Sequence, residues 1–117
     1  MTKDAYIEYC KGLENAVTDC PFENDYDTVA ARHSRTGKWF ALVMKWQGRD
    51  IVNLKCEPME AEFLRKTFEG VIPAYHMNKR HWNTVFLESD VPDREIMRLT
   101  RESFLLTGKK AVDKKRL

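Results

Sequence analysis

The segment from residue 75 to residue 83 has the residue types most suited to chemistry. It reads Tyr75-His76-Met77-Asn78-Lys79-Arg80-His81-Trp82-Asn83, which combines two histidines, two cations, two aromatic rings and two asparagines. The cations can pair with phosphates, the asparagines can hydrogen-bond to base edges or a carboxylate, and the aromatic rings can stack. This mixture favours an anionic partner, either nucleic acid or a small anionic ligand.

Most of these side chains also have a structural explanation. Tyr75 and Trp82 flank a turn and could close the core across a hairpin. Asn78 tolerates the left-handed backbone geometry of turns, and histidines often hydrogen-bond to the backbone. Lys79 and Arg80 resist an explanation from packing, so the functional prediction rests mainly on these two cations.

The sequence lacks the common motifs of catalysis and metal binding. There is no glycine-rich phosphate loop, HExxH or CxxC motif, and His76 and His81 stand in a turn without a nearby carboxylate. Cys10, Cys20 and Cys56 are an odd number without metal-ligand spacing, which predicts free thiols. We therefore expect no catalytic residues, no metal and no cofactor. Acid–base chemistry by the two histidines is the one enzyme hypothesis that the sequence allows.

Charge is unevenly distributed along the chain, although the net charge is only +2. Residues 1–27 carry two bases and seven acids, residues 28–56 carry six bases and one acid, and residues 70–87 carry no acid. Such segregation can produce one acidic and one basic face. A mosaic surface without a net field is the alternative.

The length of 117 residues is that of one domain. We expect this domain to span residues 1–108, followed by a basic, frayed tail over residues 109–117. The longest apolar run, residues 39–44, is far too short to cross a bilayer, and the N-terminus has no signal-peptide pattern. These features predict a cytoplasmic monomer without a membrane partner.

Periodicity predicts three helices and five strands. Tyr6, Cys10, Leu13 and Val17 recur at helical spacing, so the first helix is expected to start at Thr2 and to end near Asp19. Pro58 and Gly70 bound the second helix, with the glycine at the C′ position, and the third begins after Asp90-Val91-Pro92-Asp93 and runs to Gly108. The strands are predicted over residues 28–34, 38–46, 50–56, 71–75 and 81–88. Hairpin-joined strands between helices indicate an α+β fold, an antiparallel sheet with helices on one face.

The two faces of this sheet are predicted from alternation. Phe40, Leu42, Met44 and Trp46 share one parity, as do Val52, Leu54 and Cys56. One face is expected to be core, and the other to carry Lys45, Asn53 and Lys55. That second face is either plain solvent surface or a binding platform.

The segment from Tyr75 to Val85 resembles the signature of the MmcQ/YjbR family of small bacterial proteins. The strand Gly37-Lys38-Trp39-Phe40-Ala41-Leu42, the strand Asn53-Leu54-Lys55-Cys56 and the helix entry Val91-Pro92-Asp93 are similar to that family too. The resemblance implies a two-layer sandwich like that of bacterial frataxin (CyaY), and DNA binding through a double-wing arrangement of β-hairpins. Trp39 departs from the smaller hydrophobe, such as methionine, that we expect at its position.

The resemblance implies a binding role for Lys38, which follows Gly37, and for residues 78–83. With the polar sheet face included, the candidate binding residues are Lys38, Asn53, Lys55, His76, Asn78, Lys79, Arg80, His81, Trp82 and Asn83. The leading hypothesis is binding of double-stranded DNA with low sequence specificity. A small-molecule or anion-binding module and a protein-interaction adaptor are the alternatives for the same surface.

Overall fold

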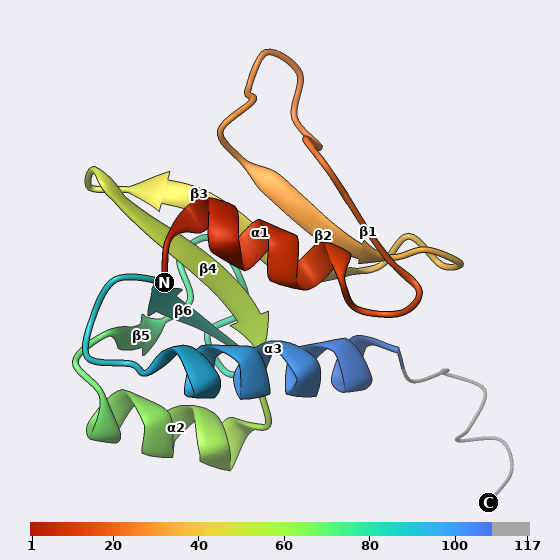
Figure 1. The fold of residues 1–117 in the computed structure, drawn as a ribbon. Coiled ribbons are helices and arrows are strands. Elements are labelled where there is room, and N and C mark those ends of the chain that lie inside the picture. Colours follow the sequence, from red (N-terminus) through yellow and green to blue (C-terminus); the bar gives the residue numbers. More distant parts are fainter. Residues whose placement is uncertain (109–117) are drawn as a thin grey trace, which may run out of the picture.

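Six antiparallel strands form one sheet, and three helices pack against one of its faces (Figure 1). The computed structural model describes residues 1–108, so the predicted tail lies outside the described residues. The helices are α1 (Lys3–Lys11), α2 (Pro58–Thr67) and α3 (Asp93–Thr107). The strands are β1 (Ala16–Asp19), β2 (Val29–His33), β3 (Trp39–Trp46), β4 (Arg49–Lys55), β5 (Val71–Pro73) and β6 (Trp82–Phe86). Within residues 1–108, no helix has both the length and the apolar composition needed to cross a membrane.

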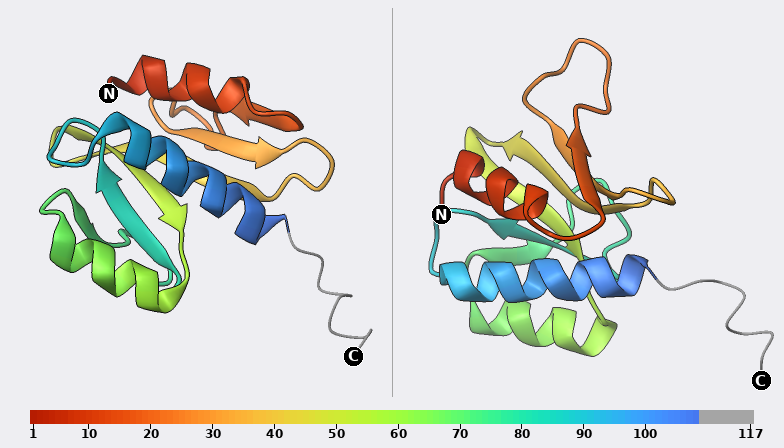
Figure 2. Two further views of the ribbon diagram at one scale, coloured as in Figure 1. Left: turned by 60° about the horizontal axis from the view of Figure 1, so that its bottom comes forward. Right: turned by 45° about the vertical axis from the view of Figure 1, so that its right-hand side comes forward.

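The strand order in the sheet is β1-β2-β3-β4-β6-β5. The first four strands follow one another as hairpins, and β6 then pairs with both β4 and β5. In the helical layer α3 lies between α1 and α2 (Figures 1 and 2). The predicted α+β class, with an antiparallel sheet and helices on one face, is confirmed.

The core lies between the sheet and the helices. Val43, Val52 and Val85 face each other across three neighbouring strands and are almost completely buried. Ile96 and Leu99 of α3 belong to the same buried cluster. Burial of such side chains stabilises the fold by roughly 1.5–3 kcal/mol each, so this layer of β-branched residues against helices fixes the sheet.

The first helix is shorter than predicted. It ends at Lys11, where the backbone N–H of Gly12 donates to carbonyls of the last turn. Asn15 then adopts a left-handed backbone with φ of 66°, and the chain reverses into β1. The prediction that Val17 lies on the helix is wrong, because it pairs with Arg32 in the sheet and is 48% exposed at its edge. The β-branched pair at residues 17 and 18 suits a strand.

A bulge changes which side chains of β3 face the helices. Ala31 pairs with Ala41 but Arg32 pairs with Trp39, so Phe40 is an extra residue in β3. As a result Phe40, Ala41 and Val43 all belong to the core cluster. The prediction that Lys45 lies on the sheet face opposite the core is therefore wrong. Lys45 follows Val43 by two residues, so both side chains are on the same face of β3. Its ammonium group forms an ion pair with Asp50 at 2.9 Å.

Gly70 has a different role from the one predicted. Helix α2 ends at Thr67, and Phe68 caps it in an extended conformation, so Gly70 is not its C′ residue. A Cβ at Gly70 would lie 2.1 Å from Ser89 Oγ and 2.9 Å from Asp90 Oδ1. The Asp90 carboxylate accepts hydrogen bonds from the backbone N–H groups of Glu69 and Gly70, each at 2.8 Å. Glycine is therefore required because two loops meet there.

Candidate functional site

A shallow hollow of about 460 Å³ lies at the end of the sheet where β3 and β4 diverge. Two lysines and two indole rings stand at its wall, together with a methionine and the last turn of α3. The lining residues are Lys38, Trp39, Lys55, Met77, Trp82, Leu106 and Thr107. None of these described lining residues is acidic, so the two ammonium groups dominate the local charge.

Helix α3 holds the two strands apart at this end. The last β3–β4 pair is Ala41 with Leu54, and the next two residues in register are Phe40 and Lys55. The hydroxyl of Ser103 lies between them, donating to the Phe40 carbonyl at 2.6 Å and accepting from the Lys55 N–H at 2.9 Å. A buried serine thus satisfies both backbone groups, and it fixes the backbone of Lys55 at the edge of the hollow.

Trp39 is held in place by contacts on the β1–β2 side. The Arg32 guanidinium lies over its ring, 5.4 Å from the ring centroid, and Arg32 also pairs with Asp19 at 2.9 Å. Phe22 meets the same indole edge-on, with the ring centroids 6.0 Å apart. These contacts leave Trp39 half-buried, with part of the side chain in the wall of the hollow.

Arg65 of α2 anchors the loop over residues 74–81. Its guanidinium donates to Asn83 Oδ1 at 2.7 Å, to the Trp82 carbonyl at 3.4 Å and to the carbonyl of Lys79. The Asn83 amide in turn donates to the Ala61 carbonyl at 3.3 Å. Asn83 is 2% exposed, so its side chain joins the loop to α2 inside the protein and does not reach a partner.

The tip of this loop is a turn built around Asn78. Its side-chain Oδ1 accepts from the Arg80 N–H at 2.9 Å, and its carbonyl accepts from the Trp82 N–H at 2.9 Å. The left-handed residue is His76, with φ of 63°, and not Asn78. The carbonyl of His81 accepts a hydrogen bond from the backbone N–H of Cys56 at 2.8 Å. Asn78 therefore shapes the turn that carries Lys79 and Arg80.

Asn53 and Thr84 fasten the start of the loop to the sheet face opposite the helices. The Thr84 hydroxyl donates to Asn53 Oδ1 at 2.5 Å and accepts from the Tyr75 N–H at 2.9 Å, while the Asn53 amide donates to the Tyr75 carbonyl at 3.1 Å. Both polar side chains are fully buried. The Tyr75 ring packs against Trp46, with the centroids 5.4 Å apart. The amide of Asn53 is thus satisfied internally.

The predicted binding residues divide into three groups. Lys38, Lys55 and Trp82 share the hollow. Arg80 lines a separate recess of about 360 Å³ with Pro58, Met59, Glu62 and Arg65. The remaining side chains are either exposed on the loop (His76, Asn78 and Lys79), half-buried (His81) or buried (Asn53 and Asn83). The structure therefore brings together Lys38 and Lys55, which are distant in sequence, rather than all four predicted cations.

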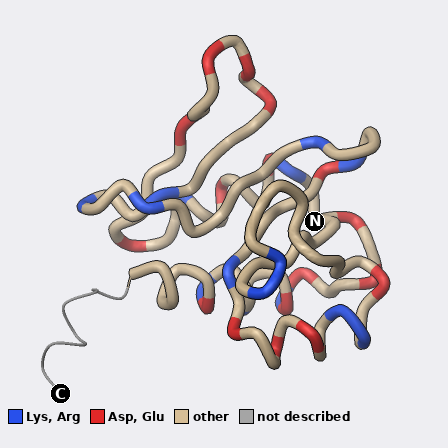
Figure 3. Tube along the Cα trace, turned by 180° about the vertical axis from the view of Figure 1, so that it is seen from behind, with Lys and Arg blue, Asp and Glu red and all other residues tan. Residues whose placement is uncertain are grey.

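The charge distribution follows the same division. Seen from behind, Lys and Arg positions mark the β2–β3 turn and the tip of the 74–81 loop (Figure 3). Asp and Glu positions gather on the long β1–β2 loop and along the rim formed by α2 (Figure 3). The hollow thus opens between two basic segments.

The thiol of Cys56, which follows Lys55 in sequence and belongs to the core, is not a nucleophile at neutral pH. Burial raises the pKa of Cys56 to about 11, and nearby Glu60 acts in the same direction, so the group stays protonated. Within the described residues, no three His, Cys, Asp or Glu side chains gather in a way that could hold a metal ion. What the site offers chemically is two ammonium groups beside two indole surfaces.

Trp39, Met77, Leu106, Thr107, Ser103 and Arg65 contribute to the site although they were not among the predicted binding residues. A signal was present for Ser103, because a serine at a position expected to be buried needs a hydrogen-bonding partner. No comparable signal identifies Arg65, since its partners are two backbone carbonyls and the side chain of Asn83, all of which only tertiary packing brings near.

Fold and site together define a small two-layer α+β protein with a lysine- and tryptophan-lined hollow at one end of its sheet. The chain belongs to the YjbR family, whose model matches residues 11–106. It is 33% identical to YyaQ of Bacillus subtilis, over 92% of this chain and 98% of that protein. It is 34% identical to YjbR of Escherichia coli, over 89% of this chain and 85% of that protein. Both relatives are described as uncharacterised proteins.

Solved structures agree with the family assignment. A crystal structure of a protein from Pseudomonas syringae superposes with a TM-score of 0.83 at 37% identity, covering 92% of this chain and 99% of the other. A protein from Deinococcus radiodurans superposes with a TM-score of 0.80 at 30% identity, covering 98% and 86% of the two chains. The family expected from the segment at residues 75–85 is thereby confirmed.

Proposed function

We propose that this protein binds nucleic acid with low sequence specificity through the hollow, with double-stranded DNA as the expected partner. The observation that carries the proposal is the convergence of Lys38 and Lys55 beside Trp39 and Trp82, with no acid among the described lining residues. Ammonium groups neutralise backbone phosphates, and indole rings offer apolar and stacking surface to sugars or bases. The proposal is of a binding protein without a catalytic step.

The internal hydrogen bonds of the asparagines support low specificity. Base edges are commonly read by asparagine, glutamine or arginine side chains. Asn53 and Asn83 are buried, and their side-chain amides donate hydrogen bonds to backbone carbonyls inside the protein. The Oδ1 of Asn78 accepts a hydrogen bond within its own turn. The lysines that remain contact phosphates, which are the same in every sequence.

The cations of the loop have a secondary place in this proposal. Lys79 and Arg80 are exposed, so they can extend the contact along the nucleic-acid backbone. Arg80 faces the recess that also contains Glu62, where a carboxylate would oppose an approaching phosphate. We therefore expect Lys79→Ala/Arg80→Ala to weaken binding less than the loss of Lys38 and Lys55.

Fluorescence anisotropy with labelled DNA tests the proposal. Duplexes of two unrelated sequences and one matching single strand are titrated at low salt and then at rising salt. We expect the duplexes to bind alike, with an affinity that falls steeply as salt rises. Absence of duplex binding at about 100 μM protein, the weak end of non-specific affinities, or affinity that does not respond to salt, would reject it.

A small anionic ligand in the same hollow is the second candidate. The concave shape and the volume of about 460 Å³ favour it, because small-molecule sites are concave and combine apolar walls with a few polar groups. A thermal-shift assay with a mononucleotide, inorganic phosphate and a dicarboxylate separates the two, since a ligand of the folded state raises Tm. A rise in Tm with one of these compounds, together with absence of DNA binding, would favour this candidate.

A further inference from the structure

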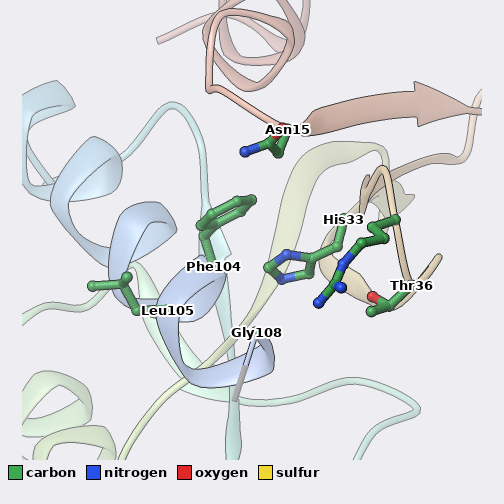
Figure 4. Close-up of a pocket in the computed structure, with 7 residues that line it drawn as sticks. Asn15, His33, Thr36, Phe104, Leu105 and Gly108 are labelled. Atoms are coloured by element: carbon green, nitrogen blue, oxygen red, sulfur yellow. The ribbon is translucent and has the colours of Figure 1, made fainter. Parts of the chain in front are cut away.

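A second pocket, of about 400 Å³, is lined by Asn15, His33, Arg35, Thr36, Phe104, Leu105 and Gly108 (Figure 4). It shares no lining residue with the hollow around Lys55. Polar groups reach it from three segments of the chain, the α1–β1 loop, the end of β2 and the β2–β3 turn. Phe104 and Leu105 of α3 form its apolar side. Among its described lining residues there is no acid.

His33 is hydrogen-bonded inside the protein through its Nε2 atom. Its Nε2 lies 2.7 Å from the hydroxyl oxygen of Thr107, and that hydroxyl donates its single proton to the Ser103 carbonyl at 2.7 Å. With that proton directed to Ser103, the Thr107 oxygen accepts from the Nε2–H of His33. Nδ1 lies on the side of Gly108, where an added Cβ would be 3.7 Å away.

The surroundings of His33 favour the neutral ring. Phe104 stacks on the imidazole with the centroids 4.2 Å apart, and Phe40 meets it edge-on at 5.6 Å. Burial lowers the pKa of His33, the backbone of Phe104 opposes this shift, and the charge of Lys38 adds to it. The charged described residues that face the ring are Arg35, in the same pocket, and Lys38, and both are cations. An anion placed there would meet the fixed positive charge of Arg35 and a base able to take up a proton.

We propose that this pocket binds the anionic oxygens of a small carboxylate or phosphate compound, with Arg35 and the Asn15 amide as donors and with proton uptake by the imidazole of His33. The apolar surface of Phe104 and Leu105 suits the carbon part of such a compound. Because a bound anion stabilises the imidazolium, anion binding and proton binding strengthen each other reciprocally. Affinity rises as pH falls from the pKa of His33 in the complex to its lower pKa in the free protein, by at most about tenfold per pH unit for one coupled proton, and it levels off at lower pH.

NMR titration of the three imidazoles tests this site residue by residue. Sulfate serves as a phosphate analogue that does not titrate in this range, and butyrate serves as the carboxylate, each compared with sodium chloride at equal ionic strength. We expect at least one of the two to raise the titration midpoint of His33 by about one pH unit. His76 is exposed on a distant loop, and its midpoint should stay within the change that sodium chloride produces. The anion that acts more strongly identifies the preferred group.

Two variants keep this test specific without endangering the fold. Arg35→Gln removes a cation from an exposed turn. Asn15→Gly removes the amide at a position whose φ of 66° glycine adopts freely. Each should reduce the anion-induced shift of His33 at least twofold. The proposal is overturned if neither anion moves His33 more than His76, or if Arg35→Gln leaves the His33 shift unchanged.

Discussion

The hydroxyl of Ser103 in α3 accepts a hydrogen bond of 2.9 Å from the backbone N–H of Lys55 at the end of β4. The same hydroxyl donates to the Phe40 carbonyl, so a helix side chain occupies the place where two strands would otherwise bond to each other. The hollow exists because the strands separate there. The position of a surface lysine is thus set by a residue of the core.

Replacing Ser103 with alanine should destabilise the protein. The substitution leaves the Phe40 carbonyl and the Lys55 N–H without their partner beside a buried position, at a cost of about 1–3 kcal/mol in the free energy of unfolding. Urea denaturation measures it, with Ser34→Ala in the exposed β2–β3 turn as the control. Equal stability of the two variants would show that Ser103 does not hold the strands.

Arg65→Ala should loosen the 74–81 loop and destabilise the fold. The guanidinium holds two loop carbonyls and the buried Asn83 Oδ1, and loss of such a partner costs about 1–3 kcal/mol. Lys66→Ala is the matched control, because it removes an exposed cation from the same helical turn and should change stability by less than about 0.5 kcal/mol. Amide hydrogen exchange should accelerate at residues 79–82 in the Arg65 variant alone. Unchanged exchange there would contradict the anchoring role.

Gly70→Ala should lower the free energy of unfolding strongly, although the backbone at Gly70 does not have the positive φ that usually requires glycine. The new methyl group would overlap Ser89, whose Cβ lies 2.7 Å from its position, and overpacking of this kind costs about 1–3 kcal/mol. Gly12→Ala serves as the control, because its methyl group would only touch the Tyr9 carbonyl at 3.4 Å. A Gly70 variant as stable as the Gly12 variant would mean that the contact with the 86–90 loop relaxes easily.

His33 should make stability depend on pH below its ordinary pKa of 6.5. Because its folded-state pKa is lowered, the unfolded chain takes up a proton first as pH falls, so stability is lost from about pH 6.5 downward through the folded-state pKa. The urea midpoint of the wild type should fall more between pH 7.5 and pH 5.5 than that of His33→Gln. Parallel losses in the two proteins would assign the pH dependence to other groups.

Much of the fold follows from sequence periodicity alone. Period-two alternation and Pro58 at the start of α2 predict elements close to those observed, because each depends on local sequence. The first helix was predicted too long because Val17 continues its apolar spacing. Pairing of Val17 with Arg32 across the sheet decided the outcome, and tertiary pairing of this kind is not visible in a local pattern.

The site is less accessible to sequence reasoning than the fold. Lys38 immediately precedes β3 and Lys55 ends β4, and only the bulge at Phe40 and the insertion of Ser103 bring them to one hollow. The conspicuous segment at residues 75–83 did predict the loop beside the hollow, and the two cations at its tip are exposed as expected. Its asparagines proved to be internal hydrogen-bonding groups, and residue type alone does not separate that role from partner recognition.

The salt dependence of DNA binding by Lys38→Ala/Lys55→Ala tests the central claim most directly. The matched control is Lys11→Ala/Lys66→Ala, which removes the same two charges from exposed positions on α1 and α2. Affinity for duplex DNA is measured by anisotropy at several salt concentrations for both variants and the wild type. If each lysine of the hollow contacts a phosphate, the slope of log K against log salt should fall by about two in the first variant and stay at the wild-type value in the control. Equal slopes in the two variants would contradict binding at the hollow.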